Sequence, residues 1–204
     1  MKTKAVFVRS SAFLLLMLQL SCSSLPSFAR KGNPAALIDE GDNYFQNGDY
    51  AKAAASYSKG IKLDRSNPVG YQKKGNVEFQ QQKYKNAIRD LSRAISLSPQ
   101  DAQSLSLRAR AYDNTSEYKK EMRDVESLLS MQPTDGTTLI WHAKLAERFG
   151  NTRQVIDDCD KAIQQGLARE QLADLYQLRA RAYKKLGKKL ESEQELAKFR
   201  SLEP

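Results

Sequence analysis

The chain has few of the residues from which disulfides, metal centres and catalytic triads are built. Its 204 residues include two cysteines, Cys22 and Cys159, one histidine, His142, and one tryptophan. A single histidine cannot form a multi-histidine metal site, and the sequence offers no set of partners for a His-based catalytic triad. The sequence also lacks a Gly-rich phosphate loop and a Gly-x-Ser-x-Gly motif. We therefore expect no metal, no other cofactor and no enzymatic activity.

Long hydrophobic runs are scarce as well. The longest is Ala12 to Leu20, nine residues, whereas a helix that crosses a membrane needs about 20. Three basic residues and no acidic one precede or flank this run, and the small-residue segment Ser27-Phe28-Ala29 follows it. This order is typical of a cleaved export signal. We predict that residues 1–29 are a signal peptide and that residues 30–33 are a short linker.

A second way of processing the N-terminus stays open. The segment from Leu18 to Cys22 resembles a bacterial lipobox, in which the cysteine is lipidated and becomes the new N-terminus; Gln19 departs from the leucine usual at its position. Cleavage after Ala29 predicts a periplasmic or extracellular protein. Lipidation of Cys22 predicts a lipoprotein anchored in a membrane, and we expect no other contact with a membrane.

From Pro34 onward a pattern of small and aromatic residues recurs every 34 residues. Gly41 recurs as Gly75, and the same position is alanine in the later copies; Gly41-x-x-Tyr44 and Ala53-x-x-x-Tyr57 form the signature of the first copy. A fixed period of this length is typical of repeat proteins. With three inserted residues at 170–172, the pattern predicts an array from 34 to 204 with five copies: 34–67, 68–101, 102–135, 136–169 and 173–204.

The period and the signature together resemble the tetratricopeptide repeat, a helix–turn–helix unit. This resemblance implies an all-α fold, a right-handed superhelical solenoid of antiparallel helix pairs, each copy burying its apolar face against the next. In the first copy we expect helices at about 35–47 and 50–63, with a turn at Gly48-Asp49. The second helix of the fifth copy, 188–202, is expected to be the cap, with polar residues Lys189, Ser192 and Glu193.

The resemblance also places a partner-binding groove on the inner face, lined by the first helix of each copy. Asp42, Gln72 and Gln103 belong to the inner positions. The groove changes from apolar and amide-rich to basic, which suggests a protein or peptide partner with an apolar anchor and an acidic end. Alternatively, the two phenylalanines pack between copies and the basic residues are a solvated face. The residues expected to bind the partner are Ile38, Phe45, Asn76, Phe79, Arg110, Lys144, Arg148, Arg181 and Lys184.

Chaperone-binding members of the family hold a C-terminal carboxylate with a defined set of lysine, asparagine and arginine. The matching positions from the first copy are Ile38, Asp42, Lys73, Gln103 and Leu107, and the frame one copy later does not carry the set either. The sequence therefore does not support a two-carboxylate clamp.

Three further features have plain structural interpretations. Cys159 occupies the position of Tyr57 and is expected to be a small buried hydrophobic residue. His142 lies where the third and fifth copies carry arginine, which favours a surface or inter-copy position. Asp157, Asp158 and Asp160 lack the spacing of a calcium loop and are expected to form a solvated face.

The formal net charge is +9, or +6 without residues 1–29, which hold three lysines and arginines and no acid. Such an excess biases association toward acidic partners but does not define a fold. Binding of single-stranded nucleic acid would need basic and aromatic residues interleaved along one groove, and here they occupy opposite ends, so no nucleic-acid partner is expected. The sequence predicts an exported protein–protein interaction module or scaffold; the alternatives are a structural subunit of an envelope complex and, less favoured, a nucleic-acid-binding protein.

Overall fold

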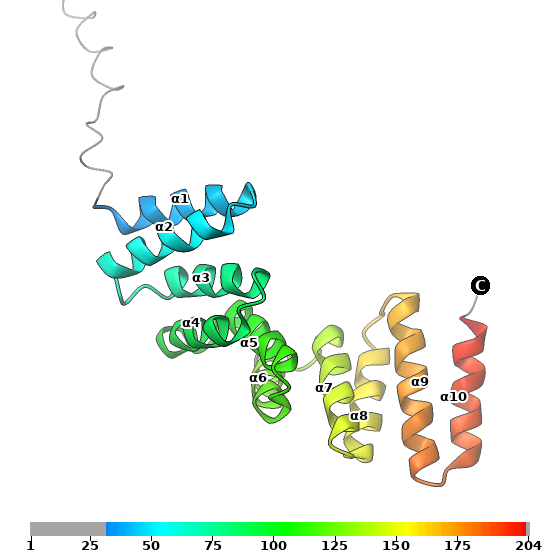
Figure 1. Ribbon diagram of the computed structural model, residues 1–204. Coiled ribbons are helices and arrows are strands. Elements are labelled where there is room, and N and C mark those ends of the chain that lie inside the picture. The colour runs from blue at the N-terminus through cyan, green and yellow to red at the C-terminus, as the bar shows by residue number, and fades with distance from the viewer. Residues whose placement is uncertain (1–31, 203–204) are drawn as a thin grey trace, which may run out of the picture.

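The computed structural model describes residues 32–202, which form ten α-helices and no strand (Figure 1). Successive helices pack as antiparallel pairs, and each pair contacts the next along the chain. The predicted all-α solenoid is confirmed, whereas the predicted signal peptide, the cleavage after Ala29 and the lipidation of Cys22 lie outside the described residues. The helices are α1 Pro34–Gln46, α2 Tyr50–Leu63, α3 Pro68–Gln80, α4 Tyr84–Leu97, α5 Ala102–Asn114, α6 Tyr118–Met131, α7 Gly136–Arg148, α8 Thr152–Ile163, α9 Arg169–Lys185 and α10 Lys189–Ser201.

The first helix of each of the first four copies begins after a side chain that caps it. In every case a side-chain oxygen accepts a hydrogen bond from a backbone N–H of the first turn, at 2.8 to 3.2 Å. These bonds satisfy N–H groups that have no partner inside the helix. Pro34 and Pro68 occupy the first helical position, where the missing N–H costs nothing. The four caps are 34 residues apart: Asn33, Asn67, Asp101 and Asp135.

The turn inside each copy has the same backbone geometry. One residue of this turn has a positive φ in each copy, and in the first copy it is Gly48, with φ of 78°. The predicted turn at Gly48-Asp49 is therefore confirmed. The second and third copies place Gln82 (φ 59°) and Ser116 (φ 60°) at this position, where a side chain is strained.

Small residues let the two helices of each copy approach closely. A Cβ atom on Gly41 would lie 2.4 Å from the Tyr57 ring, and one on Gly75 would lie 2.7 Å from Leu91 Cγ. Both contacts join residues 16 apart, one on each helix of the pair. Side chains larger than hydrogen would collide there, so the glycines are required by packing.

The fifth copy differs from its predicted form in two places. Residues 170–172, taken as an insertion, are helical and lie in the first turn of α9, which has 17 residues. Ser192, expected on the polar outer face of α10, is 7% exposed, and its hydroxyl donates to the Ala180 carbonyl at 2.9 Å. Lys189 and Glu193 are exposed on α10. Ser192 is buried because a small side chain is needed where α10 crosses α9.

The array is elongated and changes direction between its third and fourth copies. Helices α1 to α6 stack along one path, and α7 to α10 stand side by side beyond it (Figure 1). Helix α6 contacts α7 less extensively than any other pair of consecutive helices. The joint therefore leaves open space between α5 and α7 on the inner face.

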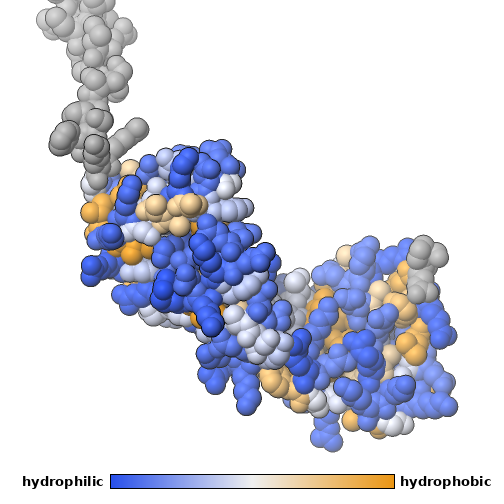
Figure 2. Space-filling model, viewed as in Figure 1, coloured by the Kyte–Doolittle hydropathy of each residue, from blue (hydrophilic) through white to orange (hydrophobic). Residues whose placement is uncertain are grey.

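The hydrophobic core follows the array as a series of clusters inside and between the helix pairs. The largest lies in the fourth and fifth copies and includes Leu139, Leu175 and Leu178, each at most 2% exposed. The face shown in Figure 2 is mainly hydrophilic, with small separate hydrophobic patches. Within residues 32–202, no helix combines the length and the apolar character that crossing a bilayer requires.

Candidate functional site

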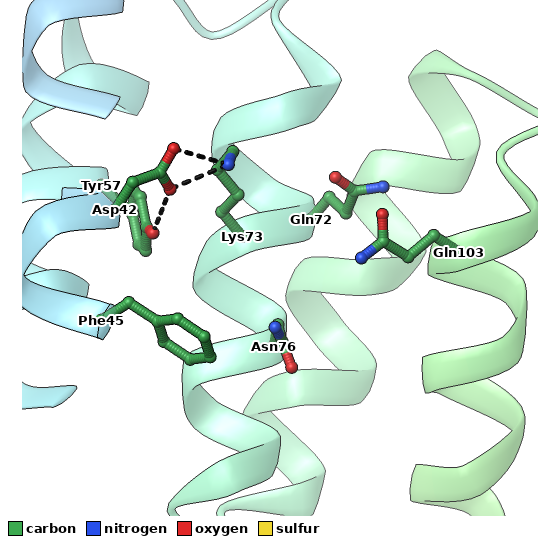
Figure 3. A pocket seen from close by; sticks show the side chains of 7 residues that line it. All are labelled: Asp42, Phe45, Tyr57, Gln72, Lys73, Asn76 and Gln103. Atoms are coloured by element: carbon green, nitrogen blue, oxygen red, sulfur yellow. Dashed lines mark hydrogen bonds and ion pairs between the residues drawn. The ribbon is translucent and has the colours of Figure 1, made fainter. Parts of the chain in front are cut away.

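The inner side chains of α1, α3 and α5, with Tyr57 of α2, surround a narrow polar pocket of about 120 Å³ (Figure 3). The helices present these side chains because their caps and close packing fix the same rotation in each copy. Five of the residues occupy inner positions that the sequence predicted, whereas Tyr57 and Lys73 do not. The pocket is lined by Asp42, Phe45, Tyr57, Gln72, Lys73, Asn76 and Gln103.

Asp42 is the electrostatic centre of this pocket. Its carboxylate accepts a hydrogen bond from the Tyr57 hydroxyl at 2.6 Å and pairs with the Lys73 ammonium at 2.7 Å. Burial and the bond to Asp42 raise the pKa of the Tyr57 hydroxyl, so it remains a donor. Because Asp42 already engages the Lys73 ammonium, this lysine is not free to hold a carboxylate of a partner.

Two amide side chains beside this centre make no hydrogen bond within residues 32–202. Asn76 and Gln103 point into the pocket with both donors and acceptors free (Figure 3). Gln72, by contrast, donates to Asp101 at 2.7 Å. The Phe45 ring forms the wall next to Asn76 and packs against Tyr50 with ring centroids 5.5 Å apart. The arrangement offers hydrogen bonds to a backbone next to an apolar surface.

A wider groove continues from this pocket along the inner face, because Gln103 lines both. Its volume is about 610 Å³, and it lies where the third copy faces the fourth. Leu128 and Trp141 give it apolar surface, and Trp141 donates from its indole N–H to the Glu121 carboxylate at 2.6 Å. Its lining residues are Ala102, Gln103, Ser106, Arg110, Asp113, Leu128, Asp135, Thr137, Thr138 and Trp141.

Arg110 and Phe79, predicted separately as site residues, lie together. The Arg110 guanidinium is 5.0 Å from the centre of the Phe79 ring, and that ring contacts Tyr84 edge to face at 5.4 Å. Arg110 is exposed and forms no ion pair with any described carboxylate. Phe79 thus both packs within its copy and supports a free cation.

The predicted basic end is partly neutralised by carboxylates of the array itself. Lys144 pairs with Asp174 at 2.9 Å, and Arg181 pairs with Glu147 at 2.8 Å, which holds the pKa of the Glu147 carboxyl below its usual range. Arg148 stacks over the Tyr118 ring at 3.8 Å. Lys184 is exposed beside α10 and lines a separate pocket of about 390 Å³.

Ile38, predicted to bind the partner, is instead part of the core. Its side chain is 8% exposed and belongs to the core of the first copy. Its Cδ1 lies 3.1 Å from where a Cβ on Gly60 would be and 3.4 Å from the same point on Gly70. The side chain is buried because the following copy places glycine opposite it, so Ile38 does not offer a surface to a partner.

Asp158 does not belong to the predicted solvated face, and His142, expected at a surface or inter-copy position, is buried inside its own copy. His142 is 9% exposed, and its Nδ1 lies 2.6 Å from an oxygen of Asp158, which is 2% exposed. Asp157 is exposed, and Asp160 pairs with Arg179. Residues 32–202 contain no group of three potential ligands that could hold a metal ion.

Cys159 is fully buried, as expected. Burial raises the pKa of its thiol to about 12, so the reactive thiolate is not populated at neutral pH. Lys73 and Trp141 line the polar pocket and the wider groove, respectively, but are not among the residues predicted to bind a partner. Both occupy the sixth position of their first helix, and recognising that this position faces inward would have found them.

Comparison with known proteins supports the repeat assignment. Residues 41–77 and 75–115 match the family model described as TPR repeat. These residues therefore contain tetratricopeptide repeats, and the described chain has the fold built from them. No curated protein matches the chain in sequence.

Several solved structures share the fold at low sequence identity. The MamA protein is 18% identical with a TM-score of 0.73, over 83% of this chain and 91% of its own. YrrB, described as a TPR protein with an unusual peptide-binding site, is 15% identical with a TM-score of 0.76, over 95% and 93%. The first TPR domain of Spaghetti (RPAP3), bound to the HSP90 peptide SRMEEVD, is 23% identical with a TM-score of 0.55, over 59% and 95%.

Proposed function

We propose that the protein is an exported protein–protein interaction module or scaffold that holds a polypeptide segment along the inner face of its array. The observation that carries this proposal is the pair of free amides on neighbouring first helices, Asn76 beside the Phe45 ring and Gln103 across the same pocket. Each amide can donate to a peptide carbonyl and accept from a peptide N–H. A polypeptide backbone offers both groups at every residue, so it matches this surface.

The rigidity of the array supports the same function. The groove side chains lie on helices that are capped at their first turns and packed through glycine contacts. A surface fixed before binding loses little conformational entropy when it binds. Among structures of the same fold, YrrB is described by its peptide-binding site and Spaghetti is bound to a peptide.

Substitutions on the two faces of one copy test the groove directly. The native partner is captured by crosslinking in its own compartment and identified by mass, and its affinity is then measured for each variant. Asn76→Ala should weaken binding about tenfold, because one or two hydrogen bonds of about 1 kcal/mol are lost. The matched control is Asn86→Ala on α4, which is exposed and lines neither pocket. Equal affinities for the two variants would contradict the proposed groove.

Export is the second part of the proposal and has its own test. The order of basic residues, apolar run and small residues in positions 1–29 motivates it. The mass of the mature N-terminus distinguishes the two routes: an unmodified Arg30 terminus means signal cleavage, and a lipidated Cys22 means anchoring in a membrane. A mature protein that retains residues 1–29 in the cytoplasm would contradict export.

A structural subunit of an envelope complex differs from this module in the permanence of the partner. Nucleic-acid binding is disfavoured because Asp113 and Asp135 line the same groove as Arg110. A steep loss of oligonucleotide affinity with rising salt, starting from a useful affinity, would favour nucleic acid instead.

A further inference from the structure

We propose that the groove between the third and fourth copies recognises a polypeptide segment in which an acidic side chain stands next to a bulky apolar one. This inference rests on the proposed function and names the chemistry of the segment. The recognising groups are Arg110 for the carboxylate, and Trp141 with Leu128 for the apolar side chain.

The groove between the third and fourth copies is large enough to hold a bulky apolar side chain of a bound segment. The groove has a volume of about 610 Å³, within the range of roughly 300–1,000 Å³ typical of ligand sites. It exists because α6 contacts α7 less closely than other consecutive helices contact each other. Leu128 from α6 and Trp141 from α7 face it from the two sides of this joint. An apolar side chain placed between them would cover surface that neither copy covers itself.

Arg110 supplies the charge that selects a carboxylate. Its guanidinium is held over the Phe79 ring, at 5.0 Å from the ring centre, and no described carboxylate pairs with it. An arginine fixed over an aromatic face keeps its N–H fork available for two parallel bonds to a carboxylate. Lys144 and Arg181, also predicted for the inner face, already have carboxylate partners, and Arg148 and Lys184 do not line this groove.

The acidic residues near the groove limit the partner to a single carboxylate. Asp135 is occupied as the cap of α7, accepting from the Thr138 backbone N–H at 2.8 Å, and Glu121 is buried and bonded to Trp141. Asp113 is exposed, lines the same groove and lies three residues from Arg110 on α5. One free cation beside one exposed acid favours a single carboxylate over a chain of phosphates.

Trp141 provides a direct reading of this groove. It is the only tryptophan in the chain, and its indole N–H bond to Glu121 fixes the orientation of the ring. A side chain that enters the groove displaces water from the ring. The fluorescence of Trp141 should therefore shift when a segment binds in this groove and stay constant when binding occurs elsewhere.

The test is a selection from random peptides, followed by titration. A displayed library of random 12-residue peptides is selected on the purified protein, and enriched peptides are synthesised and titrated while Trp141 fluorescence is followed. We expect enrichment of Asp or Glu within two residues of Leu, Ile, Phe or Trp, with a fluorescence shift on binding. Arg110→Gln should lower the affinity of these peptides tenfold or more, whereas Arg123→Gln, an exposed arginine on α6 outside the groove, should not change it.

The outcomes separate this inference from the function on which it rests. Enriched peptides without an acidic preference, or with affinities unchanged by Arg110→Gln, overturn the inference and leave a peptide-binding module. No enrichment of any peptide by the wild type contradicts peptide binding itself. Salt-sensitive binding of an oligothymidine probe that shifts Trp141 fluorescence, or a dimer in sedimentation that Ser106→Phe disrupts, assigns the groove to nucleic acid or to a second copy and likewise overturns it.

Discussion

His142 and Asp158 form a buried pair inside the fourth copy, with Nδ1 and a carboxylate oxygen 2.6 Å apart. The two residues are 16 apart, one on each helix of the pair. Every copy after the first has a cationic or imidazole side chain and a carboxylate joined across its two helices at this same spacing. The other pairs are Lys74–Asp90, Arg108–Asp124 and Arg179–Glu195. These pairs hold the two helices together at a point where the core is polar.

Removing the acid of such a pair should destabilise the array. Asp158→Ala leaves His142 and Gln154, which donates to the other Asp158 oxygen at 2.8 Å, without their acceptor. We expect the free energy of unfolding to fall by about 2 kcal/mol, the usual range for losing buried hydrogen bonds to a charged group. Denaturant titration measures this. The adjacent Asp157→Ala is the control, because Asp157 is exposed and its loss should change stability by less than about 0.5 kcal/mol. Equal losses of stability in Asp158→Ala and Asp157→Ala would mean that the buried pair of His142 and Asp158 does not stabilise the fold.

A substitution in the second turn should stabilise the protein. Gln82 has a φ of 59°, a conformation that costs a residue with a side chain roughly 1–2 kcal/mol. Gln82→Gly removes that strain but adds about 0.4–1 kcal/mol of entropy to the unfolded chain. We expect a net gain of about 0.5–1 kcal/mol in the free energy of unfolding. Gln81→Gly, at a φ of −80°, adds only the entropy and should reduce stability. A loss of stability in both variants would contradict strain at Gln82.

Most of the fold could be predicted from the sequence because its determinants are local and periodic. The turn at Gly48 and the small residues at Gly41 and Gly75 act within one copy, and the caps at Asn33 and Asn67 act on the helix that directly follows them. The helix bounds of the first copy agree with the prediction to within one residue. Repetition at a fixed period then specifies the rest of the array.

The predicted site was less accurate because its residues depend on contacts between copies. Ile38 packs against Gly60 of its own copy and Gly70 of the next copy, and a pattern within one copy cannot show the second contact. Arg181 reaches Glu147 across 34 residues, so its charge is already compensated. A double change of Arg110→Glu and Arg181→Glu should therefore affect partner binding mainly through Arg110. The predicted acidic end of the partner remains a prediction.

Filling the contact at Gly75 should destabilise the second copy. A Cβ there would lie 2.7 Å from Leu91 Cγ and 3.4 Å from the Leu91 backbone nitrogen, so overpacking should cost about 1–3 kcal/mol. The better helix propensity of alanine offsets roughly 1 kcal/mol of this cost. Gly75→Ala should therefore lower the free energy of unfolding by about 1 kcal/mol, measured by thermal or chemical unfolding. In a Leu91→Ala background the cost should disappear, because the colliding atoms are gone. A cost that persists there would refute the steric explanation.

Glu121 should give the protein a pH dependence opposite to that of an ordinary paired carboxylate. Burial raises the pKa of the Glu121 carboxyl, although the bond from Trp141 opposes this. Between the unfolded and the raised folded pKa, the folded state binds more protons, so this group's contribution to stability falls as pH rises. Lowering the pH from neutral should therefore stabilise the wild type relative to Glu121→Gln.

Glu117, one turn away, is the matched control with the opposite sign. The hydrogen bond from Lys120 lowers the pKa of the Glu117 carboxyl, so its stabilising effect is present at neutral pH and lost as the pH falls through that pKa. As the pH falls, the wild type should first gain stability relative to Glu121→Gln, above the pKa of an unfolded glutamate, and then lose stability relative to Glu117→Gln, below that pKa. Unfolding followed by Trp141 fluorescence, from neutral pH down to below the pKa of an unfolded glutamate, measures both differences. The same sign for both would show that Glu121 is not held in an unfavourable charged state, and that its bond to Trp141 outweighs the cost of its burial.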